Sequence, residues 1–177
     1  EIRLSLVGSE MCIRDRAHYL KVVADKTGSL IAASAVFGAM VSHASAENVA
    51  ALEQFGEDIG EVFQLADDLI DITSTVTGKT PGTDLREKVP TLPTLLLRAS
   101  DDPADAELKE MLDADLSDDA VLSDVLDKLR ANHVIDEARV EIQRRADRAR
   151  THLTPLPDGD AKQALEALCD EVVSRSS

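Results

Sequence analysis

Residues 46–72 read AENVAALEQFGEDIGEVFQLADDLIDI and repeat apolar side chains with helical spacing. The apolar positions of the repeat are Val49, Leu52, Phe55, Ile59, Val62, Ala66, Leu69 and Ile70. Apolar residues spaced three and four apart are typical of an amphipathic helix. Ser45 precedes the repeat, and serine is a favoured N-cap residue. The pattern therefore predicts one long helix from Ala46 to about Ile72.

The segments on either side also favour helices. Aromatic residues make up only 2% of the chain, and alanine, leucine and valine carry the apolar content, which favours helix packing over a sheet sandwich. Further helices are expected over residues 17–45 with a bend near Gly28, 94–99, 104–112, 118–131 with Ser117 as cap and Asn132 as stop, 134–153 and 160–174. Residues 73–93 contain the glycines and prolines of a loop. These features predict an all-α bundle.

Length, charge and cysteine content narrow the class further. The 177 residues suggest one domain, and the net charge of −15 argues against binding to nucleic acid or anionic lipid. The apolar run Leu30–Val41 has about twelve residues, whereas a membrane span needs about twenty, so we expect a buried core helix and no transmembrane segment. Two cysteines, Cys12 and Cys169, are too few for a disulfide framework, which favours a cytoplasmic setting.

Residues 1–16 differ from the rest of the chain. They have no sustained period and meet a clearly helical segment abruptly. We expect a non-native or disordered head at residues 1–16 and one helical domain over residues 17–177.

One face near the end of the long helix carries the strongest chemical signal. Four polar side chains share roughly one 100° arc, opposite the apolar positions. They are Gln64, Asp67, Asp68 and Asp71. Carboxylates on adjacent turns repel one another, and the negative end of the helix dipole adds to the repulsion. A hard cation would relieve it, and Mg²⁺ prefers oxygen ligands and bridges carboxylates to phosphates. The alternative is a solvated acidic surface.

Two other segments carry groups suited to phosphate. Residues 78–88 read GKTPGTDLREK, and Lys79 in this loop offers a point charge, although the spacing is not that of a Walker loop. Residues 25–28 read DKTG, where Lys26 can neutralise a diphosphate while Thr27 and Gly28 expose a backbone carbonyl. Taken alone, the first segment is also typical of a surface loop, and Lys26 of an exposed helical lysine. The histidines lack metal-ligand spacing and are interpreted as surface or packing residues: His18, His43, His133 and His152.

Together and in this order, the segments resemble motifs of the trans-polyprenyl diphosphate synthase family. Residues 26–28 (KTG) look like its Lys-Thr-Ala/Gly motif, and residues 63–71 (FQLADDLID) look like its second aspartate-rich motif. Residues 78–87, followed by the Thr-Leu-Pro of residues 91–93, look like its flexible C-terminal flap. The resemblance runs from His18 to about Arg175. It implies the C-terminal part of an isoprenoid-synthase-type helical bundle, truncated because the N-terminal helices are missing.

The resemblance also implies a role for each matching residue. The implied ligands of Mg²⁺ are Asp67, Asp68 and Asp71. The implied diphosphate contacts are Lys26 and Lys79, and the implied catalytic residues are Lys26, Thr27 and Gln64, of which the last two would present oxygen dipoles to an allylic cation. The implied activity is that of a prenyltransferase of isoprenoid biosynthesis, which elongates an allylic diphosphate with isopentenyl diphosphate and is a homodimer when full-length.

The chain departs from the family pattern in two respects. The family usually reads Glu-Gly-Lys-x-Thr-Leu-Pro, whereas here Lys88 takes the glycine position and Val89 the lysine position. The family's first aspartate-rich motif and its isopentenyl diphosphate site lie upstream of the matching region, and residues 1–16 do not replace them. We therefore expect a fragment that is inactive alone, with an exposed apolar face where the missing helices would pack.

Two other functions fit part of the pattern. A non-catalytic regulatory subunit of a heteromeric prenyl synthase often loses its acidic ligands, whereas this chain keeps Asp67, Asp68 and Asp71. A head-to-head synthase or a terpene cyclase shares the helical fold, but the KTG segment and the flap argue against it.

Overall fold

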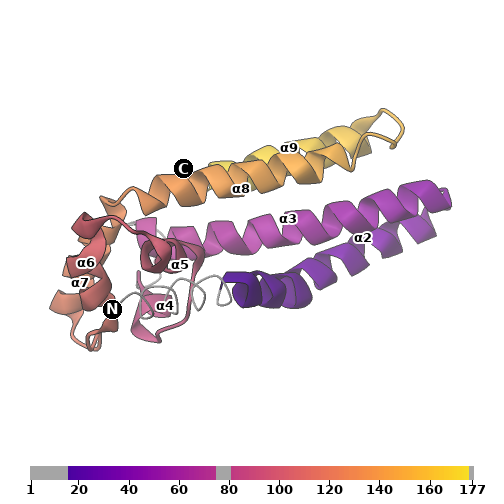
Figure 1. The fold of residues 1–177 in the computed structure, drawn as a ribbon. Helices are drawn as coiled ribbons and strands as arrows, with labels where there is room; N and C mark the ends of the chain where they lie inside the picture. Colours follow the sequence, from indigo (N-terminus) through magenta and orange to yellow (C-terminus); the bar gives the residue numbers. More distant parts are fainter. Residues whose placement is uncertain (1–15, 75–80, 176–177) are drawn as a thin grey trace, which may run out of the picture. The chain divides into compact units, whose positions relative to one another are not determined.

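The structure is a computed structural model that describes residues 16–74 and 81–175, and no strand occurs in these two ranges. Residues 16–23 are helical and lead into the π-helical turn η1 (Ala24–Gly28). The later helices are α2 (Ser29–Val41), α3 (Ala46–Thr73), α4 (Thr83–Arg86), α5 (Leu92–Ala99), the 3-10 turn η2 (Pro103–Asp105), α6 (Ala106–Asp113), α7 (Asp119–Arg130), α8 (Val134–Thr151) and α9 (Asp160–Ser174) (Figure 1). The all-α prediction is confirmed. The expected head lies, apart from Arg16, outside the described residues, as does Cys12.

The chain divides into two compact units, each with its own core. Unit 1 consists of residues 1–19 and 67–138, and unit 2 of residues 20–66 and 139–177. Helix α3 gives its longer N-terminal part to unit 2 and its end to unit 1. The predicted site residues are therefore divided between the units.

Unit 2 consists of long helices, with α2 alongside α3 and α9 alongside α8 (Figure 1). Its buried apolar residues include Ala32, Ala51, Phe55, Ile59, Val62, Leu65, Ala66, Ile142, Ala146, Leu153, Cys169 and Val172. The small residues of α2 allow a close approach to α3: a Cβ placed on Gly56 would lie 2.5 Å from the Cα of Ala32. Cys169 is buried in this core.

Unit 1 is built from short helices around a leucine-rich core. Its buried residues include Leu69, Ile72, Leu85, Leu92, Leu95, Leu97, Leu108, Leu112, Leu122, Val125, Leu126 and Leu129. Two predicted boundaries are wrong here. Asp118, not Ser117, caps α7, because its carboxylate accepts hydrogen bonds from the first amides of that helix. The predicted loop contains α4, and α5 begins at Leu92 because Thr91 and Thr94 form a capping box.

Helix α2 is not the buried core helix that the sequence predicts. Within it, only Ala32 and Ala39 are buried, whereas Leu30, Phe37 and Val41 are exposed. The helix is apolar all round, but within unit 2 it packs mainly through its small residues. By length and composition, the helical stretch Arg16–Val41 could also cross a membrane, a property that core helices of soluble proteins share.

Candidate functional site

The KTG segment lies on a distorted helical turn. Lys26, Thr27 and Gly28 belong to the π-helical turn η1, at the point where the sequence predicts a bend. π-Helical turns are rare and frequently occur at functional sites. Lys26 is exposed and Thr27 is half-buried. The helix is thus distorted where the sequence predicts a bend, and its π-helical form is a feature that the sequence does not reveal.

Thr27 and Gln64, the two residues expected to present oxygen dipoles, are in direct contact within unit 2. Thr27 Oγ1 donates a hydrogen bond of 3.1 Å to Gln64 Oε1. The contact depends on Gly60, one turn before Gln64, because a Cβ there would lie 2.7 Å from the Cα of Gly28 and 3.1 Å from the carbonyl oxygen of Thr27. The space left by this glycine is thus filled by the backbone of η1.

Asp68 has a partner that sequence reasoning missed. Its side chain is buried, and it accepts a hydrogen bond from the phenol of Tyr19. Burial raises the pKa of Tyr19, and the adjacent Asp68 charge raises it further, so the phenol keeps its proton and acts as the donor. Tyr19 is the chain's only tyrosine, and this rarity is the one signal in the sequence that could have drawn attention to it.

Asp71 is joined to residues of the predicted flap. Its Oδ2 accepts a hydrogen bond of 3.2 Å from the Asp84 amide, and its backbone oxygen accepts one of 2.9 Å from the Gly82 amide. These bonds fold the start of α4 back onto the end of α3. Burial, then the charge of Asp71, then that of Glu87 raise the pKa of the Asp84 carboxyl. Sequence reasoning placed Asp84 in the flap but gave it no part in the acidic face.

The acidic group of unit 1, defined as Asp67, Asp68, Asp71 and Asp84, fits a hard divalent cation. These residues offer only oxygen donors, and burial of Asp84, followed by the nearby charge of Asp71, raises the pKa of its carboxyl. Within residues 16–74 and 81–175, no three His, Cys, Asp or Glu side chains form a group that could hold a metal ion by themselves. Mg²⁺ is commonly held by one or two carboxylates together with waters and substrate phosphates, so a partial protein cage suits a metal–diphosphate pair.

The predicted lysines fall outside the described part of unit 1. Lys79 lies outside the described residues. Lys26 belongs to unit 2, whereas the acidic group belongs to unit 1. Among the described residues, the Lys26 ammonium has no hydrogen-bond or ion-pair partner. The combined diphosphate site therefore stays a prediction.

Lys88, which departs from the family pattern, has a structural role. Its φ of 55° is left-handed, a conformation that favours glycine and agrees with the glycine of the family pattern. Its Nζ donates hydrogen bonds of 2.8 and 2.9 Å to the backbone oxygens of Asp113 and Ala114, at the end of α6. Lys88 thus caps a helix.

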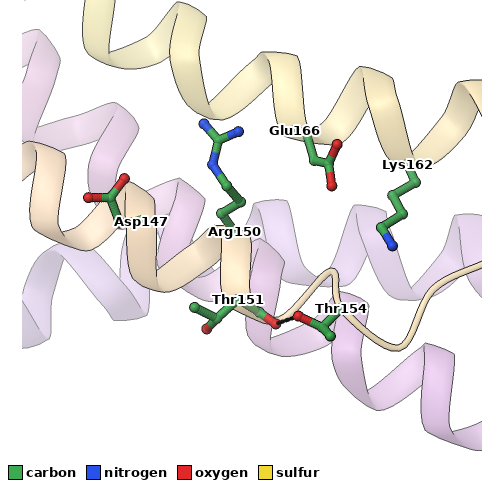
Figure 2. A pocket seen from close by; sticks show the side chains of 6 residues that line it. All are labelled: Asp147, Arg150, Thr151, Thr154, Lys162 and Glu166. Carbon is green, nitrogen blue, oxygen red and sulfur yellow. Dashed lines mark hydrogen bonds between the residues drawn. The ribbon is translucent and has the colours of Figure 1, made fainter. Parts of the chain in front are cut away.

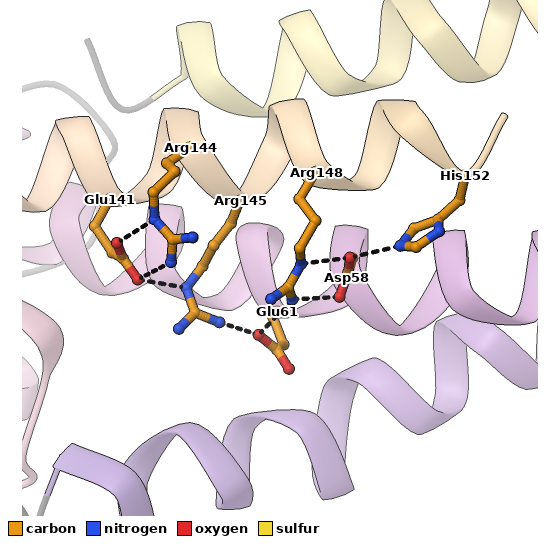
Figure 3. Close-up of polar contacts among 7 residues, drawn as sticks. All are labelled: Asp58, Glu61, Glu141, Arg144, Arg145, Arg148 and His152. Atoms are coloured by element: carbon orange, nitrogen blue, oxygen red, sulfur yellow. Dashed lines mark hydrogen bonds and ion pairs between the residues drawn. The ribbon is translucent and has the colours of Figure 1, made fainter. Parts of the chain in front are cut away.

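Unit 2 also holds a charged cluster between α3 and α8 (Figure 3). Arg148 and His152 both bond to Asp58, and Arg145 joins Glu61 to Glu141. Arg145 and Asp58 are buried. Because every one of these contacts satisfies a charge inside the helix pair, the cluster is structural.

A surface hollow of about 340 Å³ lies between the end of α8 and α9 (Figure 2). Arg150 and Lys162 lie along it, but Arg150 is paired with Asp170 and Lys162 with Asp158. None of the predicted site residues lines this hollow. It has no part in the candidate site.

Comparison with known proteins gives one consistent family. A family model described as Polyprenyl synthetase matches residues 8–129. Nonaprenyl diphosphate synthase of Mycobacterium tuberculosis is 44% identical over 159 residues, which are 89% of this chain and 48% of that protein. Dimethylallyltranstransferase of the same organism is 37% identical over 157 residues, again 89% of this chain and 48% of that protein. This chain spans about half the length of these curated relatives.

Solved structures give the same result. Geranylgeranyl pyrophosphate synthase of Corynebacterium glutamicum, complexed with calcium and isoprenyl diphosphate, matches with a TM-score of 0.84 and 40% identity, covering 97% of this chain and 56% of that chain. Polyprenyl synthase of Caulobacter crescentus, also complexed with calcium and isoprenyl diphosphate, matches with a TM-score of 0.81 and 32% identity, covering 91% of this chain and 50% of that chain. The expected isoprenoid-synthase-type fold is confirmed.

Proposed function

Since this chain belongs to the polyprenyl synthetase family, we propose that it forms the C-terminal half of a prenyltransferase that elongates an allylic diphosphate with isopentenyl diphosphate. The acidic group of unit 1 carries this proposal, because its donors are all oxygens, which suit a hard divalent cation, and because Asp84 is hydrogen-bonded to Asp71 through its amide. Two solved relatives that hold calcium and isoprenyl diphosphate support it.

We propose Mg²⁺ as the cation, held by Asp67, Asp68 and Asp71, with Asp84 adding negative charge beside Asp71. When bound, the cation supplies positive charge that a diphosphate requires in a protein of net charge −15. The carboxylates hold it at the end of α3, the same helix that presents Gln64.

The remaining residues act on the substrate. In the proposed reaction the allylic carbon–oxygen bond breaks, and its electron pair leaves with the pyrophosphate. Lys26 and Lys79 stabilise the negative charge that develops on this leaving group. The oxygens of Thr27 and Gln64, which lie 3.1 Å apart in one hydrogen bond, stabilise the allylic cation. The isopentenyl double bond then attacks the cation to form the new carbon–carbon bond, and a proton is lost.

We further propose that the complete protein is a cytoplasmic homodimer without a transmembrane segment. The likeness to a solved geranylgeranyl pyrophosphate synthase supports a place in the helical bundle for the apolar stretch Arg16–Val41. The strongly acidic composition argues against nucleic-acid and anionic-lipid partners.

Calorimetric titration of the chain with Mg²⁺ in the presence of inorganic pyrophosphate tests the proposal. We expect saturable binding that weakens at least about tenfold in Asp67→Ala and Asp71→Ala, since outer contacts alone can change metal affinity by about 10–100-fold. The matched control is Asp101→Ala, which removes an equal charge from an exposed position of unit 1. Unaltered affinity in Asp67→Ala would instead support a non-catalytic regulatory subunit.

Activity is tested in a chimera, in which this chain replaces the matching half of the Mycobacterium tuberculosis nonaprenyl diphosphate synthase. The chimera should elongate an allylic diphosphate with labelled isopentenyl diphosphate, and Asp67→Ala should abolish the elongation. A folded chimera that never elongates would contradict the proposed reaction.

A further inference from the structure

The hydrogen bond between Tyr19 and Asp68 joins positions 49 residues apart in the sequence. Tyr19 lies on the helix of residues 16–23, Asp68 lies on α3, and both belong to unit 1. The Tyr19 hydroxyl thus connects the helix of residues 16–23 to α3 at one carboxylate of the acidic group.

We propose that Tyr19 is a positioning residue that orients the Asp68 carboxylate for divalent-cation binding. This inference rests on the proposed function, because it assigns Asp68 to the metal. A buried carboxylate needs hydrogen-bond donors, and a cationic donor would offset the charge that the metal requires. A phenol donates one hydrogen bond and carries no charge.

The size of the effect follows from related metal sites. Partners that hydrogen-bond to a ligating carboxylate fix its orientation, and their loss typically costs about 10–100-fold in metal affinity. Tyr19→Phe removes only the hydroxyl and keeps the aromatic ring. We therefore expect Tyr19→Phe to bind Mg²⁺ about tenfold more weakly when pyrophosphate is present.

A role confined to folding would have a different result. It would lower the free energy of unfolding in EDTA and leave the Mg²⁺ affinity of the folded protein unchanged. Both quantities are measured for the wild type, for Tyr19→Phe and for His18→Ala, whose side chain is exposed on the adjacent position. His18→Ala should match the wild type in Mg²⁺ affinity.

The wild type supplies a second readout, because the chain has one tyrosine and no tryptophan. Its tyrosine emission therefore comes from Tyr19 alone and responds to changes at the phenol's hydrogen bond. Addition of Mg²⁺ with pyrophosphate should change this emission with the same midpoint as the calorimetric titration. The change should be absent in Asp67→Ala, which retains Tyr19.

The outcomes separate the two proposals. If the wild type binds Mg²⁺ with pyrophosphate but Tyr19→Phe binds equally well, the positioning role is overturned and the proposed function stands. If Tyr19→Phe does not fold, the tyrosine emission of the wild type decides. An emission that does not change when Mg²⁺ and pyrophosphate are added overturns the positioning role of Tyr19. An emission that changes with the midpoint of the calorimetric titration supports it. If the wild type does not bind Mg²⁺, both proposals fall.

Discussion

The backbone of Gly60 in α3 lies against the backbone of Gly28 in η1, so closely that a Cβ on Gly60 would be 2.7 Å from the Gly28 Cα. The neighbouring turn has a similar approach between Gly56 and Ala32. At this crossing Thr27 reaches Gln64 with a hydrogen bond of 3.1 Å. The absence of side chains on one face of α3 therefore places the KTG segment beside Gln64.

Replacing Gly60 with alanine should disrupt this crossing. The new methyl group meets backbone atoms that cannot rotate away, so we expect a loss of about 1–3 kcal/mol in the free energy of unfolding. Urea denaturation measures the loss. The control is Gly38→Ala, because a Cβ there has nothing within 4 Å, and alanine should stabilise that helical position by about 0.5–1 kcal/mol. Equal urea midpoints for Gly60→Ala and the wild type would contradict the close crossing.

The periodicity of residues 46–72 is sufficient to predict α3, because the buried positions of a helix recur with the helical repeat, and apolar residues occupy them. Its apolar positions Phe55, Ile59, Val62 and Leu69 are all buried. The predicted range 160–174 matches α9, whose start after Gly159 is marked by local residues alone. Such elements can be predicted from one sequence because they depend only on residues that are close along the chain.

The rest of the site depends on contacts between distant residues. Tyr19 reaches Asp68 across 49 positions, and nothing near either residue in the sequence indicates the pair. Asp84 comes to Asp71 because Gly82, at a φ of 77°, turns the chain back onto α3. The acidic residues of one helix turn were therefore predictable, whereas the groups that surround them were not.

Lys88 allows the backbone and side-chain effects at one position to be separated. Lys88→Ala loses the two hydrogen bonds to the C-terminal end of α6 but keeps the left-handed φ of 55°. It should therefore destabilise unit 1 by about 1 kcal/mol. Lys88→Gly loses the same bonds but relieves a left-handed conformation that costs a non-glycine residue about 1–2 kcal/mol. Thermal unfolding should therefore rank the glycine variant above the alanine variant. Equal stability of the two variants would count against the left-handed backbone.

Arg145 should be costly to remove from the charged cluster in Figure 3. It is buried and bonds to Glu61, whose pKa is raised by burial despite the two nearby arginines. Arg145→Met leaves Glu61 without its main partner, so we expect a loss of about 3–5 kcal/mol in urea unfolding at neutral pH. The double variant Arg145→Met with Glu61→Met should recover most of this loss. A double variant no more stable than Arg145→Met would refute the pairing.

Acidification gives an independent test of the same pair. Because the folded-state pKa of Glu61 lies above its usual value of 4.5, protonation favours the folded state as pH falls through that pKa. The penalty of Arg145→Met should therefore shrink between neutral pH and about pH 4, since a neutral Glu61 needs no cation.

His133 should make the stability of unit 1 depend on pH in the same direction, at higher pH. Its Nε2 lies 3.1 Å from Asp105 Oδ2 and its Nδ1 lies 2.9 Å from Glu137 Oε1. The hydrogen bond to Asp105, then that to Glu137, raise the pKa of His133 above 6.5. Its stabilisation is therefore fully present below 6.5 and is lost as pH rises through the folded-state pKa.

The variant His133→Gln should consequently be less stable than the wild type near pH 6, with the difference fading by about pH 9. NMR titration of His133 in the wild type should give a midpoint above 6.5. The control is His43→Gln, because His43 is exposed and none of its ring atoms bonds to a described carboxylate. This control variant should be as stable as the wild type at both pH values. A constant difference for His133→Gln across this range would show that the ring stabilises the fold by packing and not by charge.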